Sequence, residues 1–343
     1  MGRPARTLIM ALSLYARLTA FATFALIVAG GLVTSTGSGL AVPDWPLSYG
    51  MLFPPMVGGI LYEHGHRMVA GAVAALTAVL AVWLWRVDRR RWVRRLGALA
   101  LAAVLLQAVL GGLTVLFLLP TAISVAHALL AQTFFCLTVT IAMATAPGWA
   151  LAAPRPLDAG RPSLFALCAA TTAAIFAQLL LGALMRHTDA GLAIPDFPMA
   201  FGRLVPPLDD ARVAVHFAHR VWAVVVLVIA AWTVARVLRR HDDDGRLANP
   251  AFLLAGLLLF QVLLGASTVW SRKAVPAATS HVAVGALALA TSLALTIRAA
   301  RRLARPRGAA ARASEGASGA DGEAAWLGAD RAVPAAGADE ARA

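Results

Sequence analysis

The sequence predicts an all-α integral membrane protein with eight transmembrane helices, arranged as two tandem four-helix bundles related by a pseudo-twofold axis along the membrane normal. Three observations lead to this fold. Hydrophobic residues make up 60% of the chain, and charged residues only 14%. Eight uncharged apolar runs are long enough to cross a bilayer. The last four runs repeat the pattern of the first four, which indicates a duplicated unit.

The apolar runs define the expected helices in chain order. A bilayer-spanning helix needs about 20 predominantly apolar residues, and each run approaches that length. The first run continues without a charge from Leu18 to Val33, so we expect a retained helix rather than a cleaved signal peptide. The expected spans centre on residues 14–34, 68–85, 96–119, 122–145, 163–185, 213–235, 250–270 and 275–297.

The charges between the runs predict the orientation in the membrane. The segments on one side contain 20 Lys and Arg residues, and those on the other side contain 7. Because positive residues concentrate on the cytoplasmic side, we expect a multi-pass protein of the plasma (inner) membrane with both termini in the cytoplasm. The long segments 35–62 and 186–212 then face outward. The net charge of +13 reflects this topology, and no nucleic-acid-binding motif accompanies it, so no nucleic-acid partner is expected.

A duplicated motif divides the chain into two halves. Residues 30–50 (GGLVTSTGSGLAVPDWPLSYG) and 182–202 (GALMRHTDAGLAIPDFPMAFG) are identical at 10 of 21 positions. The register continues through the rest of each half with an offset of 152 to 154 residues. The expected boundaries are an N-terminal half at 1–146, a cytoplasmic linker at 147–162, a C-terminal half at 163–303 and a disordered cytoplasmic tail at 304–343.

Four of the eight histidines occupy duplicated positions: His66, His127, His219 and His281. Each lies near the outer end of an even-numbered span, so all four are expected at a similar depth, two in each half. Helix bundles build cofactor sites from facing side chains in this way, and imidazole is a common axial ligand of heme iron. The alternative is that these are interfacial polar residues without a ligand. Two matching pairs favour heme, and the scarcity of carboxylates argues against a bare metal.

One difference between the halves predicts different roles. Glu63 lies one helical turn before the first-half histidine, whereas His216 has that place in the second half. We therefore expect the first half to hold a reacting ligand and the second a permanent redox cofactor, with Glu63 exchanging protons. Arg67 and Arg220 follow the duplicated histidines and are expected to pair with heme propionates, or alternatively to reach the membrane surface as ordinary helix-end residues.

Three other histidines are expected outside these sites. His64 is expected to point away from His66, His187 to lie in an outer loop, and His241 to be solvated in a cytoplasmic charged cluster. The two cysteines, Cys136 and Cys168, lie inside apolar runs and are expected to be buried without a redox role.

The motifs GGLVTSTGSGLAVPDWP, EHGHR, GLAIPDFP and HFAHR together resemble the heme A synthase family over roughly residues 15–300. The resemblance implies conversion of heme O to heme A for terminal oxidases, by oxidation of the C8 methyl group to a formyl group through successive hydroxylations and loss of water. It implies that His219 and His281 ligate heme b, that His66, His127 and Arg67 bind the substrate heme, and that Glu63 is catalytic. Some family members carry a cysteine pair in each outer loop, and this chain has none at 35–62 or 186–212.

Two other functions fit some of these features. A bis-His diheme membrane electron-transfer cytochrome would use the same histidines but would hold two permanent hemes of equal standing. A transporter or heme exporter would place its site near the middle of the membrane, whereas these histidines lie near the outer ends of their spans. Expected partners are heme O, heme A and membrane lipid, with heme O synthase, oxidase assembly factors and a second copy of the chain as further candidates.

Overall fold

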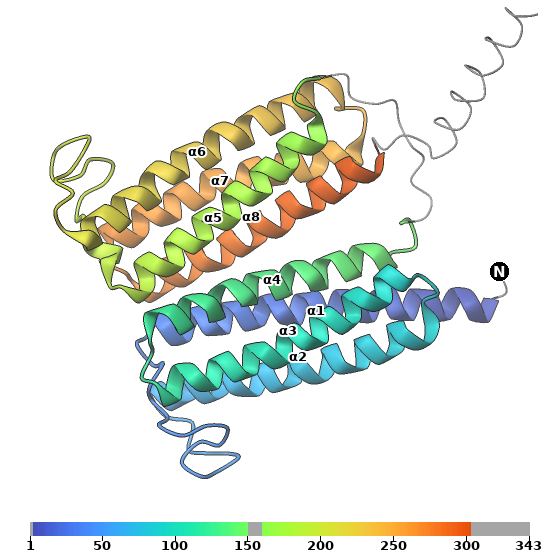
Figure 1. The fold of residues 1–343 in the computed structure, drawn as a ribbon, viewed down its shortest axis with the longest axis horizontal. Helices are drawn as coiled ribbons and strands as arrows, with labels where there is room; N and C mark the ends of the chain where they lie inside the picture. The colour runs from blue at the N-terminus through green and yellow to red at the C-terminus, as the bar shows by residue number, and fades with distance from the viewer. Residues whose placement is uncertain (1–2, 150–159, 303–343) are drawn as a thin grey trace, which may run out of the picture.

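The computed structural model describes residues 3–149 and 160–302, which form eight long α-helices and one short 3-10 helix (Figure 1). All eight long helices are long and apolar enough to span a membrane, which confirms the predicted all-α membrane architecture. The elements are α1 (Arg3–Ser35), α2 (Gly59–Val87), α3 (Arg91–Leu116), α4 (Thr121–Thr145), α5 (Leu164–His187), η1 (Ala190–Leu192), α6 (Ala211–Arg240), α7 (Gly245–Trp270) and α8 (Val275–Arg302).

The helices form two groups of four (Figure 1). In the first group, α1 and α3 each pack against both α2 and α4, so α2 and α4 lie diagonally opposite each other. The second group repeats this arrangement, with α6 and α8 on the diagonal. The long α1–α2 and α5–α6 loops lie at the same end of the molecule (Figure 1). The pseudo-twofold axis and the domain boundaries stay predictions, and the expected tail at 304–343 and most of the expected linker lie outside the described residues.

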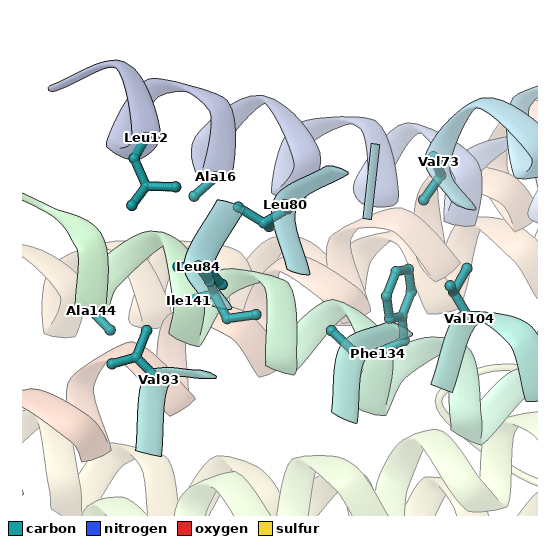
Figure 2. Close-up of a cluster of buried hydrophobic side chains, with 11 residues drawn as sticks. Leu12, Ala16, Val73, Leu80, Leu84, Val93, Val104, Phe134, Ile141 and Ala144 are labelled. Atoms are coloured by element: carbon teal, nitrogen blue, oxygen red, sulfur yellow. The ribbon is translucent and has the colours of Figure 1, made fainter. Parts of the chain in front are cut away.

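The interior of the first group is built from interlocking aliphatic and aromatic side chains (Figure 2). Leu80 and Leu84 of α2 belong to one cluster with Phe134 and Ile141 of α4, and each of these side chains is almost completely buried. The outer faces carry exposed Leu, Val, Phe and Trp residues, which suits contact with lipid. Because lipid is as apolar as these side chains, close packing and hydrogen bonds, rather than exclusion of water, hold the helices together.

Helices α1 and α4 of the first group meet α5 and α8 of the second along a shared seam. An apolar cluster on this seam joins Ile27 and Phe135 to Ala286 and Ala290. Polar bonds reinforce the end of the seam that lies near the long loops: Arg186 Nη2 of α5 donates to the carbonyl of Gly31 (3.1 Å) and to Ser35 Oγ (2.6 Å) of α1. Thr279 Oγ1 of α8 also donates to Ser35 Oγ at 3.0 Å. The two groups are therefore bonded to each other near the end that carries the long loops.

Truncation of Leu84 tests the packing of the first group. Leu84→Ala removes a completely buried side chain, and such a cavity typically costs about 2–5 kcal/mol. Leu99→Ala is the matched control, because Leu99 of α3 is 56% exposed. Thermal unfolding in detergent should show a clear drop in melting temperature for Leu84→Ala and almost none for Leu99→Ala. Equal melting temperatures for the two variants would contradict the packing described here.

Candidate functional site

The four duplicated histidines lie near the starts of the diagonal helices, on α2 and α4 in the first group and on α6 and α8 in the second. Helix α2 begins at Gly59 and α6 at Ala211, so Glu63, His66 and His219 are helical residues rather than loop residues. In the second group, the rings of His219 and His281 have centroids 6.4 Å apart and planes inclined by 61°. The structure therefore brings this predicted pair together.

The spacing of this second pair matches two axial ligands of one metal. A metal–imidazole nitrogen distance is about 2 Å, and the ring centre lies about 1 Å further on, so trans ligands have centroids roughly 6 Å apart. Among residues 3–149 and 160–302 no group of three or more His, Cys, Asp or Glu side chains could hold a bare metal ion. The donor set is thus paired imidazoles, which is the set that heme iron accepts.

Each of the four histidine rings packs against a glycine of the preceding helix. A Cβ atom added at these glycines would lie only 3.1–3.3 Å from the Cε1 atom of the facing imidazole. The pairs are Gly30–His66, Gly111–His127, Gly182–His219 and Gly265–His281. The glycine spacing was visible in the sequence repeat, but the contact it makes was not. These glycines therefore leave room for the imidazole rings of the four histidines, in addition to any role in letting the helices approach each other.

Three of these histidines contain an unpaired polar atom in the interior. The Nδ1 atoms of His66, His127 and His281 are buried and have no hydrogen-bond partner among the described residues. An unpaired buried donor is costly, and native proteins keep few of them without a reason. Together with the ring spacing, this fits imidazoles whose other nitrogen is reserved for a bound group.

In each half, an arginine that follows the first histidine of the pair is bonded to the long loop that precedes its helix. Arg67 Nη1 donates to the carbonyls of Asp44 and Leu47, both at 2.8 Å. Arg220 donates to the carbonyls of Asp196 (2.7 Å) and Met199 (2.9 Å). The predicted pairing of these arginines with propionates is not tested by these contacts, but their role in holding the loops is clear.

Glu63 is buried and bonded through both carboxylate oxygens. Its Oε2 accepts from the backbone N–H of Val42 at 2.8 Å, and its Oε1 pairs with Arg67. At the matching position, His216 accepts from the backbone N–H of Ile194 at 3.3 Å through Nδ1. The two residues thus make the same loop contact, while only Glu63 adds a carboxylate to the site.

An aspartate in each duplicated loop binds two consecutive backbone N–H groups. Asp44 accepts from Tyr49 (2.6 Å) and Gly50 (2.8 Å), and Asp196 makes the same contacts with Phe201 and Gly202. All four of these donor residues have positive φ, and such a turn gathers N–H groups into an anion-binding nest. The N–H group of Gly202, followed by that of Phe201, lowers the pKa of Asp196 below its ordinary value.

The remaining histidines differ in part from expectation. His64 turns toward the loop, where its Nδ1 bonds Ser48 Oγ at 2.8 Å, as expected for a residue that does not share the site. His187 ends α5 rather than lying in a loop. The prediction that His241 is solvated is wrong: the side chain follows the last turn of α6 and is buried, with 9% exposure. Both cysteines are free thiols, and Cys168 is fully buried.

Fold and site together define a class: multi-pass helical membrane proteins that present a histidine pair inside each of two four-helix units. Within that class, the sequence profile of the cytochrome oxidase assembly proteins (COX15-CtaA) matches residues 13–59 and 58–293. The chain belongs to this family.

Curated relatives carry a more specific description. A protein of Symbiobacterium thermophilum described as a heme A synthase is 35% identical over 249 residues, which is 69% of this chain and 78% of that protein. Heme A synthases of Halalkalibacterium halodurans and Chelativorans sp. are 28% and 29% identical, over 82% and 78% of this chain and 94% and 84% of theirs.

The nest in the second loop predicts a defined pH dependence. Because the pKa of Asp196 is lowered, its contribution to loop order is present above the unfolded value of about 3.9 and is lost only as pH falls through the folded value. Asp196→Asn removes one acceptor oxygen, so amides 201 and 202 should exchange hydrogen faster than in the parent at pH 5–7. Asp209→Asn, in the same loop, is the control. Equal protection of these amides in parent and Asp196→Asn would contradict the role of the nest.

Proposed function

We propose that this protein is a heme A synthase, a membrane oxidoreductase that converts the C8 methyl group of heme O to the formyl group of heme A. The family membership and the description of its curated relatives support the proposal. The observation that carries it within the molecule is a histidine pair spaced for one iron atom in the second half, set against a first half in which a glutamate replaces the additional histidine.

The two halves then have different duties. His219 and His281 would hold heme b as a resident cofactor in the C-terminal half, residues 163–303. His66 and His127, with Arg67, would bind heme O and heme A in the N-terminal half, residues 1–146. Heme b supplies one-electron transfer when bound. The protein's own task is to hold the substrate porphyrin still beside a proton acceptor inside an apolar bundle.

Glu63 is the proposed catalytic residue of the first half. Oxidation of a methyl group to a formyl group releases protons as well as electrons, and a carboxylate one turn from His66 can accept them. Its bond to Arg67 and to the loop N–H of Val42 fixes the direction of the carboxylate. The matching His216 bonds the backbone of Ile194 and of Ala190 in the α5–α6 connection, which supports a structural role there.

Arg67 and Arg220 are proposed to pair with propionates while they hold the loops. A guanidinium has five N–H donors, so loop contacts leave donors for a carboxylate. The proposed topology has both termini in the cytoplasm and the heme sites toward the outer face of the plasma membrane, following the excess of positive charge on the inner side. Heme O synthase, oxidase assembly factors and a second copy of the chain are the proposed protein partners.

Removal of a proposed heme b ligand should be visible by spectroscopy. His219→Ala and His281→Ala should each abolish the low-spin heme signal of the purified protein, because one imidazole cannot supply both axial ligands. His241→Ala, at the opposite end of α6, should keep the parent spectrum. A low-spin signal that is unchanged in both His219→Ala and His281→Ala would overturn the heme b assignment.

Glu63→Gln separates catalysis from cofactor binding. The amide keeps the size of the side chain and an acceptor for Val42 but cannot take up a proton, so extracted hemes should contain no heme A while the heme b spectrum stays normal. Hydrogen exchange of loop residues 42–50 controls for loop order. Heme A formed at the parent level, measured by mass spectrometry, would reduce Glu63 to a structural residue.

A further inference from the structure

Three of the four duplicated histidines are held by a glutamine on a neighbouring helix. In each case the glutamine Nε2 donates across the helix boundary to the backbone carbonyl of the histidine. The pairs and their N···O distances are Gln107–His127 (2.8 Å), Gln178–His219 (3.0 Å) and Gln261–His281 (2.8 Å).

Each glutamine lies four residues before the glycine that packs on the same histidine ring. Residues four apart share one face of a helix, so consecutive turns hold the backbone and the imidazole of a single histidine. The resulting Gln-x-x-x-Gly clamp occurs at Gln107–Gly111, Gln178–Gly182 and Gln261–Gly265. Three independent helices therefore repeat the same two-point contact.

The glutamines also bring an unused acceptor to each clamp. In the described part of the chain, the Oε1 atoms of Gln107, Gln178 and Gln261 are buried without a partner, and so are the Nδ1 atoms of His127 and His281. The amide nitrogen of Gln178 lies 3.2 Å from both ring nitrogens of His219. A metal-bound imidazole almost always donates its other N–H to an oxygen acceptor, which fixes the tautomer and strengthens the ligand. The unpaired Oε1 of each glutamine is taken as that acceptor when a heme is bound.

His66 is the exception. Its glycine, Gly30, is retained, but the residue four positions earlier is Leu26, which has no polar atom in its side chain. The Nδ1 of His66 is buried without a partner within residues 3–149 and 160–302, as are those of His127 and His281, so the missing glutamine alone distinguishes His66. His66, the first of the four duplicated histidines, thus has the glycine contact of the clamp without the glutamine contact.

We propose that the glutamine clamp makes His127, His219 and His281 fixed axial ligands, and that Leu26 makes His66 the releasable one. This inference rests on the proposed function. A synthase must release its product and admit new substrate in one half while it keeps its cofactor in the other, and a single weak ligand in the substrate half meets both needs. The porphyrin face that opens is then the face beside His66, where Glu63 also lies one turn away.

Leu26→Gln tests the proposal by adding the fourth clamp. The purified full-length protein is loaded with ferric protoporphyrin, and heme transfer to excess apomyoglobin is followed by absorbance. The parent should show a fast phase from the first half and a slow phase from the second. Loss of a residue that hydrogen-bonds to a metal ligand typically changes metal affinity by roughly 10–100-fold. Leu26→Gln, which adds such a residue, should therefore slow the fast phase about tenfold or more and leave the slow phase unchanged. Leu26→Met, similar in volume and lacking an amide, should match the parent.

Gln261→Leu provides the reciprocal test in the second half, and it keeps the proposal falsifiable should Leu26→Gln fail to fold. Loss of this amide should accelerate the slow phase about tenfold or more. Gln132→Leu is the matched control, because Gln132 shares with Gln261 a buried and unpaired Oε1 atom in the described structure, and no bond to a histidine carbonyl is seen for it. Gly265→Ala against Gly256→Ala on the same helix tests the steric half of the clamp, since nothing lies within 4 Å of a Cβ at Gly256.

The outcomes separate this inference from the proposed function. Unchanged transfer phases in both Leu26→Gln and Gln261→Leu, with a normal low-spin spectrum, would overturn the clamp and leave the synthase proposal standing. A parent protein that shows no low-spin heme and binds no ferric protoporphyrin would overturn both.

Discussion

The close approach of an imidazole ring to a helical glycine is the contact on which the rest of this structure depends. It occurs four times, and at each place a Cβ would come within 3.1–3.3 Å of the ring. Such a contact requires the helix that carries the histidine and the helix that carries the glycine to be fixed in register. In lipid that register comes from close packing and from hydrogen bonds between helices, which here include those donated by Gln107 and Gln261. The bundle is therefore arranged around its histidines.

Much of the fold was predictable from the sequence because the membrane limits the choices. A chain in lipid must satisfy its backbone hydrogen bonds internally, so long apolar runs become helices, and charge bias and duplication give their order. The start of α2 at Gly59 was less predictable, because polar residues such as Glu63 and His64 interrupt the apolar pattern that marks a span. The burial of His241 was not predictable, because its charged neighbours in sequence say nothing of the packing around the end of α6.

The candidate site was predictable to the level of residue types and no further. The repeat pointed to the four histidines, and the substitution of Glu63 for His216 pointed to unequal halves. The contact of Glu63 with Val42 was beyond the sequence, because the loop must fold back over α2 to make it, whereas Arg67 lies one helical turn from Glu63 on α2 itself. The glutamines lie on a different helix from the histidines they contact, so their spacing acquires meaning only when the helices are in place. The absence of a polar side chain at Leu26 likewise acquires meaning only once Gly30 of the same helix is seen to pack on His66.

The seam between the halves has a consequence for the proposed chemistry. Helices α4 and α8 each carry one of the duplicated histidines, and these two helices pack directly against each other (Figure 1). In a synthase of this design, the residues that would hold the substrate porphyrin and those that would hold the cofactor lie on helices that pack directly against each other within one polypeptide. The two sites would then need no separate docking protein to stay close together. Gene duplication, on this view, produced the second binding site and also the α4–α8 contact that keeps it next to the first.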